Sequence, residues 1–405
     1  MVYIILYFVY FLGHGIYFST LSPYIISQYG DQSTYIFFAS QLGFPLGYFF
    51  SGYISDRTGS IRPLLLASVL IQAPLQFTLY SGYGFFTTAA AASAARFFFA
   101  FNFQLITISA LENGGLKKFG GFRAYGTAGF FLIHAFMFLW EFSGVPLFQN
   151  IVFSSSNAGK ISSVFLLLSA IPVFFIKNNR ISHEHYYFND VLRILKSPQV
   201  VLFFILSFFF YFSYQVVDYY LGSFLNETGG MSLVYASWAL AVILEIPFMP
   251  LTSRIFHFKK QNILFMISTL TGSIRFAVLT MHAAGIPAIP ILATQLLHGI
   301  HFTGYYMGSI FRIKKIFPGH LYGTAYGAYM VLAVSAGGMC GNLLLGSLLH
   351  SETAIFNGNL KIFFENKFTY IFIISMGIHI ILFFIFMFLP GSSSESKDIY
   401  ETKKN

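Results

Sequence analysis

Three ionisable residues lie deep inside apolar parts of this sequence, namely Glu245, Arg275 and His298. Each comes about ten to thirteen residues into its apolar run, so helices rising about 1.5 Å per residue would place all three at one depth. A charge at the centre of a bilayer costs about 2.5 to 3.5 kcal/mol, and it persists where it is paired or faces a wet cavity. A carboxylate that alternately meets and leaves an arginine changes its proton affinity, which makes Glu245 a candidate proton carrier with Arg275 and His298. The alternative is a static Glu245 to Arg275 ion pair that fixes helix packing.

Further polar side chains follow helical stripes that would face one cavity. Residues three or four positions apart share a face of a helix. One such face carries Gln295, His298, Phe302 and Tyr305, with His301 beside it, and another carries Tyr211, Tyr214, Gln215 and Asp218. We take Gln295, His301, Tyr305, Tyr214, Gln215 and Asp218 as candidate substrate-binding residues. For Asp218 the alternative is an interfacial position near the end of its run.

Two more candidates for the substrate site come from the first half of the chain. Arg96 stands alone in its apolar run, with Ser93, Ala100 and Thr107 on its side of a helix. An arginine in that position indicates an anionic ligand group, or else an acidic partner on another helix. His14 would reach the same cavity, or would be a hydrogen-bonded packing histidine.

The elements that must position these residues are membrane-spanning helices. Hydrophobic residues make up 56% of the 405 residues and charged residues only 9%, whereas a soluble domain carries roughly 25% charged residues. A bilayer core needs roughly 20 apolar residues per helix. We therefore predict an all-α integral membrane protein with twelve spans, at 3–27, 34–54, 63–81, 85–111, 123–147, 161–176, 200–221, 233–253, 262–283, 288–311, 322–347 and 368–389.

Orientation follows from the lysines and arginines, because positive loops stay in the cytoplasm. With the N-terminus inside, eighteen of the 23 lysines and arginines fall in cytoplasmic loops or the tail and three fall outside. We therefore expect both termini to be cytoplasmic. The same spread assigns the net charge of +9 to topology and argues against a nucleic-acid partner, which would require a basic patch.

The tetrapeptide YGTA occurs twice, at 125–128 and 322–325, where it opens the fifth and the eleventh predicted spans. The agreement of position and topology predicts two parallel halves of six spans each. The boundaries that we predict are 1–176 for the first half, 177–199 for a cytoplasmic linker, 200–389 for the second half and 390–405 for a cytoplasmic tail. Parallel halves with a midplane site between them are typical of one class of secondary transporter.

The loop after the second span reads GYISDRTGSIR, residues 52–62. It resembles the major facilitator signature G-x-x-x-D-R-x-G-x-[RK]-[RK], with Ile61 in place of the first of the two final basic residues. Gly52 permits close helix contact, Gly59 permits a tight turn, and Asp56 can meet a helix N-terminus. With Arg57 and Arg62, these residues are a candidate gate.

A finer resemblance covers spans four to eleven. FGGFRAYGTAGF, residues 119–130, is similar to a pattern of the lactose permease, and LEIP, SIRF and QLLHG at 244–247, 273–276 and 295–299 look like phenylpropionate-transporter and nucleoside-symporter relatives. The resemblance implies a proton symporter in which an acid, an arginine and a histidine serve substrate recognition and coupling. It also implies a sugar-contacting role for Arg123, with Glu112 as a possible partner, although the predicted spans place both at the cytoplasmic margin.

No zinc-hydrolase spacing, nucleotide-binding P-loop or nucleophile elbow occurs in the sequence, so we expect neither an enzyme nor a metal or cofactor site. We predict a monomeric, multi-pass protein of the bacterial inner membrane that imports a small organic solute, such as a sugar, nucleoside or aromatic acid, together with protons. The alternative is an exporter or facilitator without proton symport. The fifth span lacks the proline-containing motif of antiporter relatives, which disfavours exchange.

Overall fold

The computed structural model describes residues 1–143, 155–177, 188–255, 261–283, 289–317, 321–350 and 368–389, and these ranges contain helices and no strand. Helix covers most of each of the twelve predicted spans. Within these described ranges, eight stretches are long and apolar enough to cross a membrane by length and composition. The predicted class, an all-helical integral membrane protein, is confirmed.

The first half of the chain forms α1 (Val2–Tyr29), α2 (Ser33–Thr58), α3 (Arg62–Leu79), α4 (Phe85–Ser143) and α6 (Ser155–Val173). The helix α4 contains the predicted span 85–111 and most of the predicted span 123–147, and the helical conformation is interrupted between them at Gly115. There φ is 65° and ψ is 174°, a conformation that glycine adopts without steric cost. The second part of α4 therefore starts before Arg123, so that Arg123 lies inside a helix.

The second half forms α8 (Pro198–Ile243), α9 (Glu245–Ile255), α10 (Gln261–Ala283), α11 (Ile289–Ile316), α12 (Tyr322–Tyr329), α13 (Ala336–His350) and α14 (Thr369–Phe388). A six-residue π-helical segment, Met330–Ser335, joins α12 to α13 within the eleventh span. The helix α8 contains the seventh span and part of the eighth, and it turns at Gly229 and Gly230. The eighth span continues as α9 after a break at Leu244.

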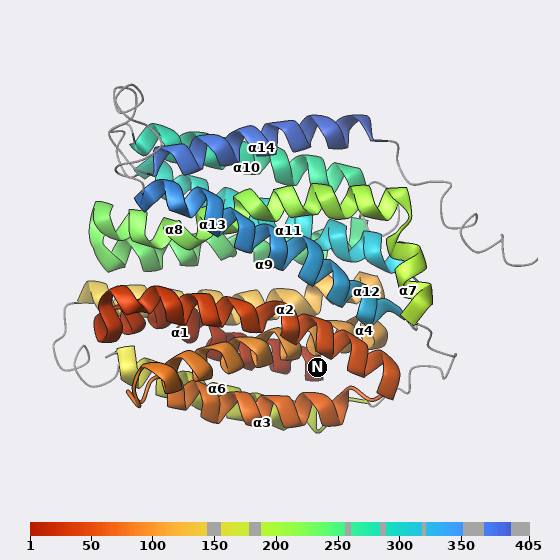
Figure 1. The fold of residues 1–405 in the computed structure, drawn as a ribbon, viewed down its shortest axis with the longest axis horizontal. Coiled ribbons are helices and arrows are strands. Elements are labelled where there is room, and N and C mark those ends of the chain that lie inside the picture. The colour runs from red at the N-terminus through yellow and green to blue at the C-terminus, as the bar shows by residue number, and fades with distance from the viewer. Residues whose placement is uncertain are drawn as a thin grey trace, which may run out of the picture.

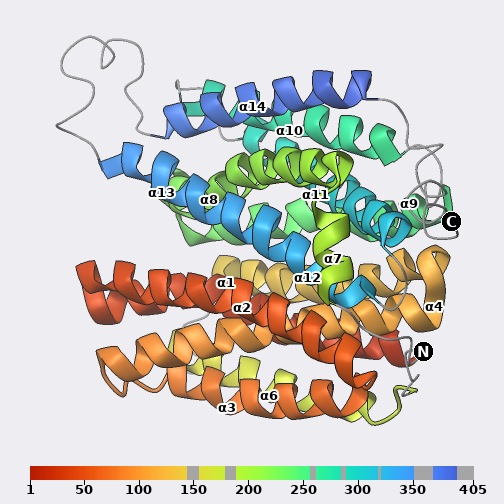
Figure 2. The same cartoon turned by 45° about the vertical axis from the view of Figure 1, so that its right-hand side comes forward.

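Figure 1 shows the two halves side by side, with the red to yellow helices below and the green to blue helices above. Figure 2 shows that α12 comes down against α2 at the end of the bundle where the chain starts. We call this the N-terminal end. A short helix, α7 (Phe188–Leu195), occupies part of the predicted linker, whereas residues 178–187 of that linker and the predicted tail 390–405 lie outside the described residues.

Candidate functional site

A cavity of about 310 Å³ lies between the two halves. Helices α1, α2 and α4 supply one wall, and α8, α9, α11, α12 and the π-helical segment supply most of the other. Seven of the predicted site residues line this cavity: His14, Arg96, Arg123, Tyr214, Gln215, Glu245 and His298. Most of the remaining lining is aromatic.

A chain of polar contacts crosses from one half to the other at the cavity wall. Arg123 Nη1 donates to Thr127 Oγ1 at 3.1 Å, and Thr127 Oγ1 donates to Glu245 Oε2 at 3.1 Å. The other carboxylate oxygen, Glu245 Oε1, lies 3.7 Å from His298 Nε2. The same imidazole nitrogen lies 3.4 Å from the hydroxyl of Tyr214. One carboxylate thus contacts both halves of the molecule through groups that donate or exchange protons.

Local structure brings these groups together. Glu245 is the first residue of α9, and a carboxylate is favoured at a helix N-terminus. A Cβ added to Gly299 would lie 2.7 Å from the backbone nitrogen of Glu245, so this glycine lets α11 approach α9 closely enough for His298 to reach the carboxylate. On the facing half, the guanidinium of Arg123 lies over the ring of Phe11, 4.3 Å from its centroid.

Other predicted residues lie behind the cavity. Arg275 is fully buried and donates to Gln295 Oε1 at 3.2 Å, and neither residue is part of the lining. The structure therefore does not bring Arg275 into the cavity beside Glu245, because a shared depth does not imply a shared helix face. His301 also lies behind, with its Nε2 2.8 Å from His379 Nε2. Tyr305 donates to Ser207 Oγ at 3.1 Å, and the side chain of Asp218 lies outside the described residues.

Arg96 and His14 occupy the wall formed by the first half. The guanidinium carbon of Arg96 lies 4.5 Å from the ring centroid of Phe44 and 5.6 Å from that of Phe99. The His14 ring stacks on Phe99 with 3.9 Å between centroids. Phe99 is therefore a shared platform for a cationic group and an imidazole.

At the N-terminal end, the candidate gate residues join α2 to α12. Asp56 Oδ2 accepts from the backbone nitrogen of Thr324 at 2.6 Å and from its hydroxyl at 2.8 Å. A Cβ added to Gly52 would lie 2.2 Å from the carbonyl oxygen of Gly323, so only glycine fits there. Gly59 ends α2 in the left-handed conformation, with φ at 61°. Arg57, which donates to Tyr53, and Arg62 are exposed.

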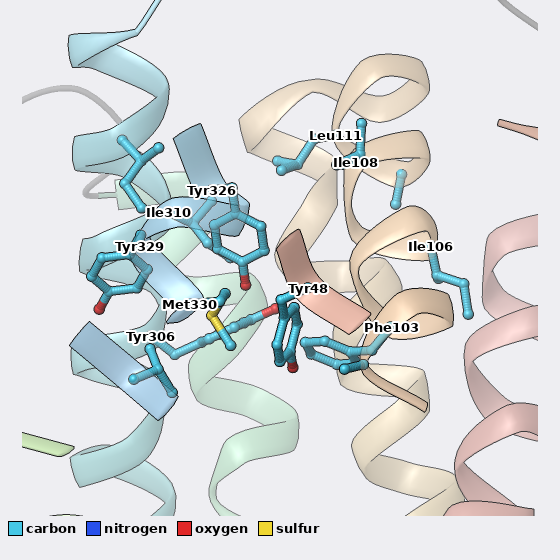
Figure 3. Close-up of a cluster of buried hydrophobic side chains, with 14 of the residues drawn as sticks. Tyr48, Phe103, Ile106, Ile108, Leu111, Tyr306, Ile310, Tyr326, Tyr329 and Met330 are labelled. Atoms are coloured by element: carbon cyan, nitrogen blue, oxygen red, sulfur yellow. The ribbon is translucent and has the colours of Figure 1, made fainter. Parts of the chain in front are cut away.

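A second contact between the halves lies beside the first. Gly120 of α4 donates its backbone N–H to Ser253 Oγ of α9 at 2.9 Å, and a Cβ at Gly120 would lie 2.1 Å from the carbonyl oxygen of Met249. Figure 3 shows the buried side chains between the halves, where Tyr48 and Phe103 of the first half face Tyr306, Tyr326 and Met330 of the second. The N-terminal end is thus closed by backbone contact and aromatic packing.

Burial also affects the charged groups of this end. Asp56 lies two residues beyond the predicted span 34–54, and burial raises its pKa from 3.8 to about 7, although the hydrogen bonds from Thr324 act in the opposite direction. Burial lowers the pKa of Lys314, and the carboxylates of Glu112 and Asp56 oppose that change. Asp56 therefore keeps its proton to a higher pH while the contact is closed than it would in water.

Sequence reasoning missed Thr127, although the signal was present. Thr127 is the third residue of the first YGTA copy and Thr324 is the third residue of the second. Each donates its hydroxyl to a carboxylate of the opposite half, Thr127 to Glu245 and Thr324 to Asp56. The repeat thus encodes an equivalent contact twice.

The model of the MFS_1 like family matches residues 2–357, which confirms the resemblance predicted from the loop motif, and no curated protein matches the sequence. A mutant of the nucleoside transporter NupG is 18% identical over 95% of this chain and 98% of its own, with a TM-score of 0.70. The proton:xylose symporter XylE is 14% identical over 96% of this chain and 95% of its own, with a TM-score of 0.68. The E. coli fucose:proton symporter FucP is 14% identical over 96% of this chain and 97% of its own, with a TM-score of 0.68. At these identities, the structural likeness shows the fold alone.

Proposed function

This chain belongs to the MFS_1 like family, and from that premise we propose that it imports a small organic solute together with a proton. Transport itself is supported by the family and by the fold of its structural neighbours. Those neighbours are described as carriers of a nucleoside, xylose and fucose, two of them with protons. These neighbours support a sugar or a nucleoside as the proposed solute class, and the sequence resemblance at 244–247, 273–276 and 295–299 adds an aromatic acid.

The observation that carries the proposal is the chain from Arg123 through Thr127 and Glu245 to His298. Glu245 is 4% exposed and contacts groups of both halves. Relative movement of the halves changes the donors around its carboxylate, and this changes its affinity for a proton. Glu245 is thus the proposed proton carrier, with His298 as its partner. The proposed role of Arg275 is electrostatic, exerted from behind the cavity.

Alternating access requires contacts that break on each side of the cavity in turn. We propose that the N-terminal end faces the cytoplasm of a bacterial cell and is closed here by Asp56 with Thr324 and by Gly120 with Ser253. On the far side of the cavity, Phe18 of α1 meets Trp238 of α8 across the halves, with 5.0 Å between ring centroids. This aromatic pair is the proposed outer gate.

The proposal is tested by adding candidate sugars, nucleosides and aromatic acids to proteoliposomes and recording the external pH. Wild type is expected to raise the external pH when its solute is added, and Glu245→Gln is expected to lose this response. Uptake without proton movement, unchanged in the variant, would instead establish a facilitator. A rise in external pH on efflux of preloaded solute would favour an exporter that exchanges solute for protons, because a symporter would release protons together with the solute.

A further inference from the structure

The cavity contains a cation whose charge is not balanced nearby. Within the described part of the chain, Arg96 makes no hydrogen bond and no ion pair; its contacts are the faces of Phe44 and Phe99. The half-buried guanidinium of Arg96 gains part of its stabilisation from the aromatic rings, but its five donors still need acceptors. A charge in such a position is retained where a counter-ion or a wet cavity meets it.

The lining as a whole also carries a net positive charge. Among the described lining residues, Arg96 and Arg123 are the permanent cations and Glu245 is the acid. The Glu245 carboxylate is already contacted by Thr127 and His298, so it is not the acceptor for Arg96. An anionic group would restore neutrality, and the planar fork of an arginine matches the two oxygens of a carboxylate.

The aromatic walls and the volume of the cavity add a second requirement for its ligand. Phe99 carries the Arg96 guanidinium near its ring and the stacked imidazole of His14. Opposite it, the lining includes Trp238 and Phe302 of the second half. Aromatic rings that enclose a small cavity favour a planar aromatic ligand through stacked or edge contacts. A volume of about 310 Å³ accommodates one such ring with a short acidic side chain.

We propose that the transported solute is an aromatic monocarboxylate whose carboxylate is bound by Arg96 and whose ring packs beside Phe99. This inference rests on the proposed function, since it names the solute of the same cavity. It selects the aromatic acid from the three proposed classes. His14, which makes no hydrogen bond within the described residues, supplies a further donor to the carboxylate.

The test uses matched pairs that differ in charge alone: benzoate with benzamide, phenylacetate with phenylacetamide, and 3-phenylpropionate with its amide. Calorimetric binding to the full-length protein in nanodiscs is expected to favour at least one acid over its amide by about tenfold to a hundredfold. Arg96→Gln should bind the acid and the amide equally. Arg254→Gln, an exposed arginine at the end of α9, should keep the wild-type preference. Cyclohexanecarboxylate, which lacks the aromatic ring, should bind more weakly than benzoate.

Failure of the proposed anion site and failure of the proposed transport give different results. Equal binding of acid and amide by wild type, or a preference that survives in Arg96→Gln, overturns the inference. Binding of none of the acids by a protein whose proteoliposomes take up a sugar or a nucleoside overturns the inference and leaves the proposed transport intact. Tight, Arg96-dependent binding of an acid that is never taken up keeps the anion site and overturns the proposed transport.

Discussion

At the scale of single residues, the acid at the N-terminal end has a consequence for pH dependence. Asp56 is buried against α12, and its pKa rises from 3.8 to about 7 on burial. Since the closed contact binds the proton more tightly than an open, hydrated Asp56 does, protonation favours closure. Closure is therefore strongest below about pH 4, weakens as pH rises toward 7, and is constant above that.

This prediction is checked with spin labels at the exposed positions Thr58 and Arg254, which lie on opposite halves at the same end, in a Cys340→Ser background. The population with the short interlabel distance should fall between pH 4 and pH 7 in the labelled protein. Asp56→Asn should remove that dependence while Glu112 and Lys314 are unchanged. A pH profile that persists in Asp56→Asn would assign it to another group.

Residue types and their depth could be predicted from the sequence, but direction around the helix axis could not. The sequence predicts that Glu245, Arg275 and His298 form one cluster. In the structure Glu245 and His298 meet at the cavity, whereas Arg275 donates to Gln295 behind it. On α11, the face that lines the cavity carries His298, Phe302, Tyr306 and Ser309. Of the predicted stripe, His298 and Phe302 lie on this face, whereas Gln295 and Tyr305 do not line the cavity. Aromatic and polar residues occur all around α11, so amphipathicity did not determine its rotation.

At the scale of elements, the YGTA repeat predicts how helix pairs are held across the interface. Replacing Thr127 by Val removes the hydroxyl between Arg123 and Glu245. This should destabilise the closed state by about 0.5 to 1.5 kcal/mol and lower the ratio of closed to open molecules by about twofold to tenfold. Thr127→Ser keeps the hydroxyl and should behave as wild type. The same spin-label pair measures both variants.

Thr324, in the second YGTA copy at 322–325, provides the matched comparison for Thr127. Thr324→Val also removes a hydroxyl, but the backbone nitrogen of Thr324 still donates to Asp56 at 2.6 Å. Its effect on closure should therefore be smaller than that of Thr127→Val. Equal behaviour of Thr127→Val and Thr127→Ser would show that the hydroxyl does not hold the halves together.

Element boundaries also explain why Arg123 was misplaced. Hydropathy put it at the margin, because Lys117 and Lys118 interrupt the apolar run before it. In the structure the helix continues on both sides of Gly115, and Arg123 is 5% exposed and part of the cavity lining. Hydropathy reports where lipid contact ends, whereas a helix extends as far as its neighbours pack against it.

At the scale of the whole molecule, hydropathy and the repeat predicted two helical halves because both depend on chain length and composition. The cavity depends on side chains that no single helix determines. Arg96, Thr127 and Glu245 come from different spans, and their spacing follows from glycine contacts such as Gly120 with Met249 and Gly52 with Gly323. The proposed mechanism assigns movement to those contacts and proton exchange to Glu245.

The most direct measurement compares accumulation with exchange for Glu245→Gln, using the solute that wild-type proteoliposomes take up. With an inward proton gradient, wild type is expected to accumulate that solute, whereas the variant should not accumulate it but should still exchange labelled for unlabelled solute. Exchange without accumulation is expected when the two halves still move but the transporter no longer carries a proton. Accumulation by Glu245→Gln equal to that of wild type would contradict the account, because coupling would then not depend on this carboxylate.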